Sequence, residues 1–353
     1  MRVLMIGRDI SIFHPASAVR ERLVKLAAEV GEIADLTFTK MTEGASEVKD
    51  HSLTLIPTQS SGPWRYVSDA YKLGRQLSIP DLITTQDPFL AGLAGVKLKK
   101  FFNRPLEIQL HTDVLSPSFK WFSLKNFIYY YLARFTLPRA DRVRVVSQRL
   151  KLSLIKQGWM AEDKIYVLPI YVADLNSAPQ APSWLSQVPA QAKIILMAGR
   201  LETEKRYPLA LKAFAQLADK NTVLVIAGSG SLLSSLQALA VQLSIDDRVL
   251  WVGALGPEEM VRSYEVAHLF IHTSAYEGYG LVLVEAAMVG LPIVSTAVGI
   301  AEEVGAQISL PTPADLAQRL TEQLRAPVKS LLPPRVSETE YQQVLKSEWS
   351  KLL

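Results

Sequence analysis

Two carboxylates, Glu277 and Glu285, lie eight positions apart in the segment Ser274-Ala-Tyr-Glu-Gly-Tyr-Gly-Leu-Val-Leu-Val-Glu285. A short strand-like run precedes this segment, and residues 281–289 form an apolar run of helical length. Glycines in the turn let the main chain approach a ligand at the helix N-terminus, where unpaired N–H groups favour an anion. Glu277 can reach such a ligand, whereas Glu285 lies inside an apolar helix and needs a polar partner. Taken alone, the same residues also fit a simpler hypothesis, in which Glu277 caps the helix and Glu285 pairs with a neighbouring arginine.

Two other predicted strands lead into loops that could contribute to the same site. Strand 194–197 is followed by Arg200 and Lys205, and strand 222–226 by Gly228-Ser-Gly230. Because ligands of open parallel sheets bind beyond the carboxyl ends of the strands, we expect these loops to meet at one edge. The Gly-Ser-Gly turn could admit a phosphate or simply make a tight bend. It lacks the third glycine of a dinucleotide fingerprint and does not follow the first strand, which argues against a nicotinamide or flavin site.

Together these loops predict a site for a diphosphate joined to a polyhydroxylated group. Cations and helix N-termini suit the diphosphate, and carboxylates suit hydroxyl groups because they only accept hydrogen bonds. The chain has no Asp-X-Asp motif, so we expect no metal ion and assign the neutralisation of a departing diphosphate to Arg200 and Lys205. The alternative for these two cations is a surface ion pair with Glu202 or Glu204.

Strand-like apolar runs alternate with segments of helical period along the whole chain. This alternation predicts an α/β protein with two doubly wound parallel sheets, whose strand ends hold the residues named above. In the first half we expect strands at 2–6, 33–38, 53–56, 82–85, 106–110, 142–147 and 164–168, with helices at 17–30, 68–77, 88–99, 126–135 and 149–157. In the second half we expect strands at 194–197, 222–226, 248–252, 268–273, 293–295 and 307–310, with helices at 208–218, 232–242, 257–267, 281–289, 300–304 and 314–324.

Length and composition set the limits of this organisation. A chain of 353 residues suits two domains, and the segment 173–191, with Pro179, Pro182 and Pro189, reads as the linker. We predict a first domain at 1–172 and a second at 173–334. A terminal amphipathic helix within 335–353 must pack on another element. The chain has no cysteine, which excludes disulfides and thiol nucleophiles, and no apolar run approaches the roughly 20 residues of a membrane span. We therefore expect a soluble or peripheral cytoplasmic protein.

Charge is divided unevenly between the halves. Residues 1–172 hold 24 Lys and Arg against 16 Asp and Glu, whereas residues 173–353 hold 14 against 18. The excess is greatest at 97–151, with 12 basic and 3 acidic side chains among many aromatic residues. Such a surface could contact anionic lipid or phosphate, or it could be a solvated basic face over ordinary core aromatics.

The second half resembles the GT-B glycosyltransferases of family 4, which are retaining enzymes that use nucleotide sugars. The segments that carry the resemblance are Ala198-Gly-Arg-Leu, Val225-Ile-Ala-Gly-Ser-Gly230, Asp247-Arg-Val-Leu-Trp-Val-Gly253, Glu277-Gly-Tyr-Gly-Leu-Val-Leu-Val-Glu285 and Gly290-Leu-Pro-Ile-Val294. In the first half the likeness is looser: Ala140-Asp-Arg-Val-Arg-Val-Val-Ser147 resembles the last strand of the family's N-terminal domain. The family's glycine pair after the first strand is replaced here by Gly7-Arg-Asp-Ile.

The resemblance implies roles for individual residues. Glu277 and His111 would contact the donor sugar, Arg200 and Lys205 would hold the diphosphate, and Glu285 would bind the nucleotide ribose. By the same resemblance the donor site would include Gly228, Gly230, Gly253, Gly278, Tyr279, Gly280 and Leu281. It also implies a GT-B fold, with a cleft between two Rossmann-like domains and a C-terminal helix that returns to the first.

We therefore predict a metal-independent retaining glycosyltransferase that moves a sugar from a nucleotide diphosphate donor, UDP- or GDP-linked, to an acceptor hydroxyl on a glycan or a lipid. No further cofactor and no nucleic-acid partner are expected. The alternatives are a nucleotide-sugar epimerase or phosphorylase of the same architecture, and a catalytically silent subunit that binds sugar nucleotides.

Overall fold

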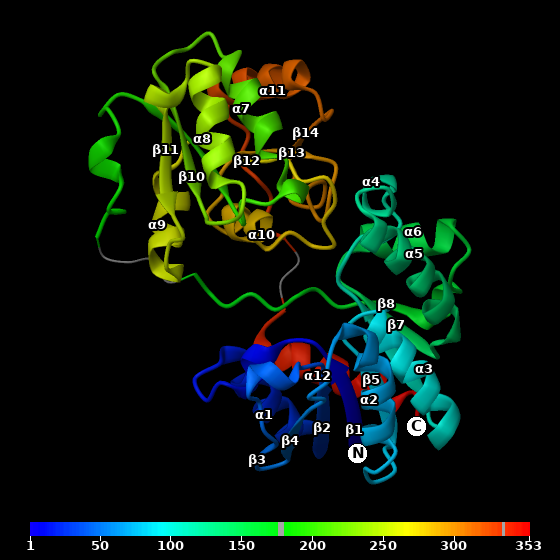
Figure 1. Cartoon of the computed structure of the whole chain (residues 1–353). Coiled ribbons are helices and arrows are strands. Elements are labelled where there is room, and N and C mark those ends of the chain that lie inside the picture. The colour runs from blue at the N-terminus through cyan, green and yellow to red at the C-terminus, as the bar shows by residue number, and fades with distance from the viewer. Residues whose placement is uncertain (176–179, 334–335) are drawn as a thin grey trace. The chain divides into compact units, whose positions relative to one another are not determined.

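The computed structural model describes residues 1–175, 180–333 and 336–353. The chain divides into two compact units, one formed by Met1–Tyr171 with Val336–Leu353 and the other by Val172–Arg335 (Figure 1). The first boundary lies one residue from the expected one. The second expected boundary, at 334/335, and Pro179 of the expected linker lie outside the described residues.

The N-terminal unit is built on an eight-stranded sheet in the order β3-β4-β2-β1-β5-β6-β7-β8. All neighbouring strands are parallel except β3, which pairs antiparallel with β4. Its strands are β1 (Arg2–Gly7), β2 (Glu32–Thr37), β3 (Val48–Asp50), β4 (Leu53–Pro57), β5 (Leu82–Thr85), β6 (Leu106–Leu110), β7 (Arg142–Val145) and β8 (Ile165–Val167). Its helices are α1 (Ala18–Val30), α2 (Tyr66–Gly74), α3 (Leu90–Phe102), α4 (Pro117–Lys120), α5 (Leu124–Thr136), α6 (Gln148–Lys156) and α12 (Glu338–Ser350).

The C-terminal unit is built on a six-stranded parallel sheet in the order β11-β10-β9-β12-β13-β14. Its strands are β9 (Lys193–Ala198), β10 (Thr222–Ala227), β11 (Val249–Gly253), β12 (Leu269–His272), β13 (Ile293–Thr296) and β14 (Gln307–Ser309). Its helices are α7 (Tyr207–Ala215), α8 (Leu233–Gln242), α9 (Pro257–Val266), α10 (Leu281–Met288) and α11 (Pro313–Arg325). The order places β9 and β10 side by side, so the Arg200 loop and the Gly228 loop share one edge of the sheet.

The C-terminal helix α12 belongs to the N-terminal unit. Its Leu345 and Trp349 are buried in the same apolar cluster as β1, β2, β4 and α1. The Trp349 Nε1–H donates to Glu107 Oε2 at 2.9 Å, and Glu348 forms an ion pair with Arg142. The helix begins with a capping box, in which Ser337 and Glu340 each bond the other's backbone N–H. The return of the last helix to the first unit is thus built from core packing and buried polar contacts.

Three local expectations differ from the structure. Strand β3 and the one-turn helix α4 were not predicted, because each is too short to show a hydrophobic period. The helix expected at 300–304 is wrong: residues 299–305 form a hydrogen-bonded turn between glycines with positive φ at both ends. Within the part of the chain that the structure describes, no helix has both the length and the apolar character needed to cross a membrane.

Candidate donor-binding site

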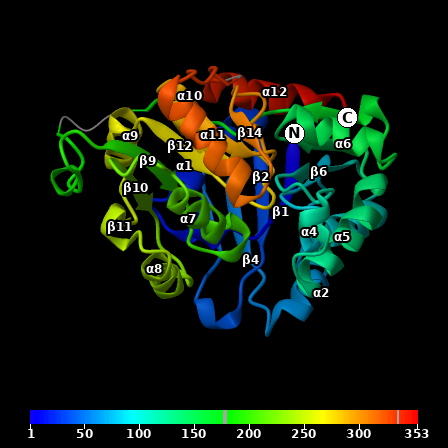
Figure 2. The same cartoon turned by 90° about the horizontal axis from the view of Figure 1, so that it is seen from above.

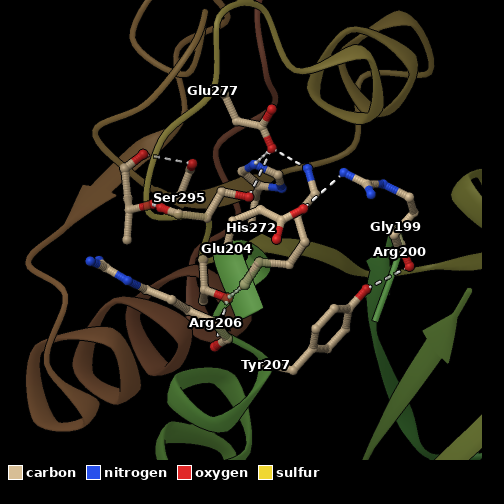
Figure 3. A network of polar contacts seen from close by, with 12 residues as sticks. Gly199, Arg200, Glu204, Arg206, Tyr207, His272, Glu277 and Ser295 are labelled. Carbon is tan, nitrogen blue, oxygen red and sulfur yellow. Dashed lines mark hydrogen bonds and ion pairs between the residues drawn. The ribbon is translucent and has the colours of Figure 1, made fainter. Parts of the chain in front are cut away.

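Three glycine-containing loops follow β9, β10 and β11 and are hydrogen-bonded to one another in a row. The Gly199 N–H donates to the Ala227 carbonyl at 3.0 Å, and the Gly228 N–H donates to the Gly253 carbonyl at 2.7 Å. The Tyr207 hydroxyl, from the first turn of α7, donates to the Gly199 carbonyl at 2.9 Å (Figure 3). The row holds the loop that carries Arg200 and Lys205 in a fixed place at the sheet edge.

The Gly228-Ser-Gly230 turn is shaped by close backbone packing. A Cβ on Gly228 would lie 1.9 Å from the Gly199 carbonyl oxygen, and a Cβ on Gly230 would lie 2.5 Å from that of Leu201. Gly228 also has φ +150°, a conformation that residues with a Cβ avoid. Of the two interpretations of this turn, the tight bend has a direct structural cause, and phosphate contact by Gly228, Gly230 or Gly253 stays a prediction.

Glu277 lies in the loop between β12 and α10, and three groups converge on one of its two carboxylate oxygens. Oε1 is paired with the Lys205 ammonium, accepts a 2.8 Å hydrogen bond from Ser274 Oγ, and lies 3.4 Å from His272 Nε2 (Figure 3). Among the described residues, no side chain or backbone group bonds Oε2. The arrangement fixes the carboxylate through one oxygen and leaves the second as an acceptor for a ligand hydroxyl.

The charges around Glu277 keep its carboxylate ionised. Burial alone would raise the pKa of Glu277, but the adjacent His272 ring and the Lys205 ammonium outweigh it and lower the pKa to about 2. Both side chains of the Lys205–Glu277 pair are 17% exposed, so their attraction is screened less than that of a surface pair.

The backbone around Lys205 is held against the Glu277 loop. Arg206, the residue after Lys205, has φ 52°, a left-handed conformation that costs a residue with a Cβ about 1–2 kcal/mol. The Thr273 hydroxyl donates to the Lys205 carbonyl at 2.8 Å, and the Ala275 N–H donates to the Glu204 carbonyl at 2.7 Å. These bonds join the two segments that supply the cation and the carboxylate.

Arg200 differs from Lys205 in its surroundings. Its side chain is 73% exposed and donates to Glu204 Oε1 at 2.8 Å. This is the surface ion pair that the sequence offered as the alternative for Arg200, whereas Lys205 pairs with Glu277 rather than with Glu202 or Glu204. An exposed pair of this kind contributes little to stability, so Arg200 can exchange its partner for an anionic ligand at small cost.

The turn from Gly278 to Leu281 leads from Glu277 into α10. Gly280 caps the helix with φ 91°, Tyr279 is buried, and Leu281 is the first helical residue. The Ile300 N–H donates to the Tyr279 carbonyl at 3.0 Å, and a Cβ on Gly299 would lie 2.1 Å from that oxygen. Gly299 therefore lets the connection between β13 and β14 pack closely against this turn.

Glu285 has the polar partner that the sequence demanded, but the partner is a tyrosine. The Tyr264 hydroxyl, on α9, donates to Glu285 Oε2 at 2.8 Å. Burial raises the pKa of Glu285, and the bond from Tyr264 partly offsets that rise. The simple hypothesis of a Glu285–arginine pair is wrong within the described residues, because the pairing group there is Tyr264.

His111 follows β6 in the N-terminal unit. Its Nε2 lies 3.2 Å from Gln109 Oε1, which also accepts a 3.0 Å bond from Arg144. Because that oxygen can only accept, the proton resides on Nε2 and Nδ1 is an acceptor. Burial, and then the charge of Arg144, lowers the pKa of His111 to about 3. The neutral ring lines a cavity of about 280 Å³, which is also lined by Gln109, Arg144 and side chains of α1 and α12.

Sequence reasoning assigned no role to His272, Thr273 and Ser274. His272 and Ser274 lie at Glu277 Oε1, and Thr273 bonds the backbone of Lys205 and Arg206. His272 is 2% exposed and ends an otherwise apolar strand, at the position where β12 opens toward the ligand edge. Three consecutive polar residues at the carboxyl end of a buried strand were the available signal.

Comparison with known proteins identifies the family. The family described as Glycosyl transferases group 1 matches residues 184–325, and that described as Glycosyltransferase Family 4 matches residues 28–172. The chain is 26% identical over 292 residues to the alpha-monoglucosyldiacylglycerol synthase of Streptococcus pneumoniae, covering 78% of this chain and 66% of that protein. It is 36% identical over 115 residues to the D-inositol 3-phosphate glycosyltransferase of Mycolicibacterium smegmatis, covering 32% of this chain and 26% of that protein. The matches thus span less than two thirds of these relatives' own length.

Solved structures share the fold. The sucrose-phosphate synthase of Thermosynechococcus elongatus aligns with a TM-score of 0.76 at 20% identity, over 100% of this chain and 94% of that one. HepE of Anabaena, solved in complex with UDP and glucose, aligns with a TM-score of 0.67 at 20% identity, over 100% and 95%. Since the two family matches together account for most of the chain and the neighbouring structures have the same two-sheet architecture, the chain belongs to the group 1 (family 4) glycosyltransferases and has a GT-B fold.

Proposed function

We propose that this protein transfers a sugar from a nucleotide diphosphate donor, UDP- or GDP-linked, to an acceptor hydroxyl, with retention at the anomeric carbon and without a metal ion. The observation that carries the proposal is the geometry of Glu277. The Lys205 ammonium and the Ser274 hydroxyl hold one oxygen of an ionised carboxylate, and the other oxygen has no partner among the described residues. A carboxylate prepared in this way suits a ligand that donates hydroxyl hydrogens.

The cations have a separate task in this proposal. When the bond between the anomeric carbon and the diphosphate oxygen breaks, negative charge accumulates on the departing diphosphate. The acceptor oxygen forms a new bond to the anomeric carbon, and the proton of the acceptor hydroxyl passes to the diphosphate. Lys205 and Arg200 follow β9 at the same edge as Glu277 and neutralise that charge. In this proposal Arg200, whose side chain is exposed, contacts the diphosphate, and Glu285 accepts a hydrogen bond from the nucleotide ribose.

The alternative enzymes of this architecture and the silent subunit use the same donor groups, so product analysis separates them. Support for a nucleotide sugar comes from the HepE structures with bound UDP and glucose, and the names of the relatives support a transferase. Transfer to an acceptor distinguishes the proposal from epimerisation of the free donor sugar and from phosphorolysis.

The acceptor in this proposal is a lipid or a lipid-linked glycan, met at the cytoplasmic face of a membrane. The Streptococcus pneumoniae relative is named for a glucosylated diacylglycerol, and residues 1–172 carry the excess of basic side chains. The protein would then bind the membrane peripherally through its N-terminal unit.

The experiment is a thermal-shift screen of nucleotide sugars, followed by mass spectrometry of reactions that contain lipid extracts as acceptor. We expect one nucleotide series to raise the melting temperature and its sugar to appear on a lipid, with and without EDTA. Absence of any donor-dependent shift would reject the donor site. Activity that EDTA abolishes and Mg²⁺ or Mn²⁺ restores would reject the metal-free mechanism.

A further inference from the structure

Helix α5 of the N-terminal unit presents a row of large apolar side chains to solvent. The exposed fractions are 77% for Leu124, 50% for Ile128, 50% for Tyr131 and 42% for Phe135, and Trp121, just before the helix, is 71% exposed. The four helical residues recur at the three- and four-residue spacing that places side chains on one face of a helix. The opposite side of α5, with Asn126, Ala133 and Thr136, is buried in the unit. We call the five exposed side chains the α5 stripe.

The segment of the chain that holds the α5 stripe carries only positive charge. Residues 114–140 contain four basic side chains, Lys120, Lys125, Arg134 and Arg139, and no Asp or Glu. Within the described part of the chain, none of these cations forms an ion pair. They lie instead near aromatic rings: Lys120 Nζ is 4.3 Å from the Tyr130 ring centroid, and the Arg139 guanidinium carbon is 3.7 Å from that of Phe135.

The positive surface continues past the end of α5 into a groove of about 750 Å³. Its lining includes Lys100, Arg104 and Arg139, together with Lys99 and Lys351. Lys99 is already paired with Asp141 at 2.7 Å, and Lys351 with Glu348 at 2.5 Å. Lys100, Arg104 and Arg139 have no ion-pair partner among the described residues, so the groove retains uncompensated charge. Arg139 lines the groove and also lies over the ring of Phe135, a member of the α5 stripe.

A lone apolar patch of this size would favour aggregation, and a lone basic patch would be an ordinary solvated surface. The combination of an apolar helix face with flanking cations, aromatic side chains and no acid is the arrangement of a helix that lies in a membrane interface. In such a helix the apolar side chains enter the acyl boundary, while Lys and Arg contact anionic headgroups.

We propose that helices α4 and α5, which lie side by side (Figure 2), form a membrane-binding surface: the α5 stripe inserts into the interface of an anionic bilayer, and the groove at Lys100, Arg104 and Arg139 holds lipid phosphates. The inference deepens the proposed function, since it names the surface that contacts the lipid. It rests on the proposed function for the reason why the protein binds a membrane, namely to reach a lipid acceptor. The charge count alone did not show which aromatic residues of this stretch lie in the core. The proposal assigns insertion into the bilayer to the exposed ones, Trp121, Tyr131 and Phe135.

The test is co-sedimentation of the full chain with vesicles of phosphatidylglycerol and phosphatidylcholine, and with vesicles of phosphatidylcholine alone, at low and high salt. The stripe variant carries Leu124→Ser, Ile128→Ser and Phe135→Ser. The charge variant carries Lys100→Gln, Arg104→Gln and Arg139→Gln. The matched control carries Leu233→Ser and Val241→Ser, exposed apolar residues on α8.

We expect wild type and the control to sediment with anionic vesicles, and the stripe variant to lose at least about 10-fold in partition coefficient at both salt concentrations. The charge variant should lose mainly the part of the binding that salt weakens. Trp121 fluorescence should shift to the blue on binding, and Trp121→Phe should remove that shift.

Wild type that stays in the supernatant with anionic vesicles at low salt would overturn the proposal, as would a stripe variant that binds like wild type. Self-association of wild type through the stripe without vesicle binding would also overturn it and would assign the face to a protein contact. Thermal shift with UDP and GDP, measured on every variant, reports the donor site separately. Intact nucleotide binding alongside failed vesicle binding would leave the proposed sugar transfer untouched.

Discussion

Each of the two units of this protein holds a glutamate in a network of polar contacts, and the two networks differ in which carboxylate oxygens they occupy. Glu107, on β6, is 0% exposed, and both of its oxygens are occupied: Oε1 accepts from Thr84 and Gln109, and Oε2 from Tyr166 and Trp349. Among the residues that the structure describes, all contacts of the Glu277 carboxylate are on Oε1. A buried carboxylate with both oxygens bonded is part of the architecture, whereas one held by a single oxygen at a sheet edge is prepared for a ligand.

The largest effect should come from removing one of the partners of Glu107. Trp349→Ala removes a fully buried indole and one donor to Glu107, so we expect the N-terminal unit to lose about 4 kcal/mol of unfolding free energy. Hydrogen exchange measured by mass spectrometry should show the loss in peptides from β6 and α1. Trp349→Phe, which keeps most of the volume, should cost clearly less. Equal losses in both variants would mean that packing around the indole matters little.

The ligand-binding glutamate should respond in activity rather than stability. Glu277→Gln keeps the shape but removes the charge, and we expect turnover to fall at least about 100-fold, equivalent to about 2.7 kcal/mol of activation free energy. Steady-state kinetics with the donor found by the screen measures this, with the exposed Glu258→Gln as control. Wild-type turnover in Glu277→Gln would remove that carboxylate from the reaction.

A third carboxylate, Asp35 on β2, differs from both glutamates, because one of its oxygens is unbonded and also inaccessible to a ligand. Its Oδ1 accepts from Thr37 at 2.8 Å, and its Oδ2 is buried without a partner. Burial foremost, with a contribution from Asp9, raises the pKa of Asp35 to about 7. Because the folded-state pKa lies above the unfolded value, the group's favourable contribution is complete below about pH 4 and is lost as the pH rises through 7.

Asp35→Asn cannot ionise, so we expect its stability relative to wild type to be about 4 kcal/mol more favourable at pH 8 than at pH 4. The new amide N–H₂ is also buried without a partner, which costs about 2 kcal/mol at both pH values. The net change is therefore a gain of about 2 kcal/mol at pH 8 and a loss of about 2 kcal/mol at pH 4. Denaturant unfolding at both pH values measures it. The same change in stability at pH 4 and pH 8 would show that ionisation of Asp35 is not the cause.

The smallest effect concerns the two cations of the donor site. Arg200→Ala should weaken binding of the nucleotide diphosphate about 10-fold, or about 1.4 kcal/mol, with no change in stability, because its present partner is an exposed surface ion pair. Lys205→Met should weaken binding similarly and also lower the melting temperature, since it leaves Glu277 without its cation. Isothermal titration with the free nucleotide separates the two. Unchanged affinity in Arg200→Ala would place that residue outside the site.

The sequence could predict which C-terminal loops come together because its signals there are local. Glycine turns directly after buried strands, and a carboxylate in one of them, depend on a few neighbouring residues and on the rule that strand ends share an edge. Lys205 and Glu277 were expected at one site, and they pair there. The contact of His272 with Glu277 was not predicted, since the run of three polar residues indicates only a strand end, and the fold is needed to place His272 Nε2 3.4 Å from Glu277 Oε1.

The N-terminal unit was harder because its polar contacts join distant segments. Glu107 and Trp349 are far apart in sequence, and nothing local indicates their bond. Similarly, the basic and aromatic residues at 97–151 could be counted, but the sequence did not show which of them are buried. Phe119 is 3% exposed and Trp121 is 71% exposed, although they are two positions apart. Lys99, which the charge count treated like its neighbours, is neutralised by Asp141.

The return of α12 to the N-terminal unit has a consequence for synthesis. The core of that unit includes Leu345 and Trp349, so it lacks part of its packing, and Glu107 lacks one donor, until almost the whole chain has left the ribosome. The C-terminal unit, formed by a continuous segment, is complete earlier. We therefore expect the unit that comes second in the sequence to finish folding first, and a truncated chain that ends at residue 337 to contain a protease-resistant second unit beside a protease-sensitive first one.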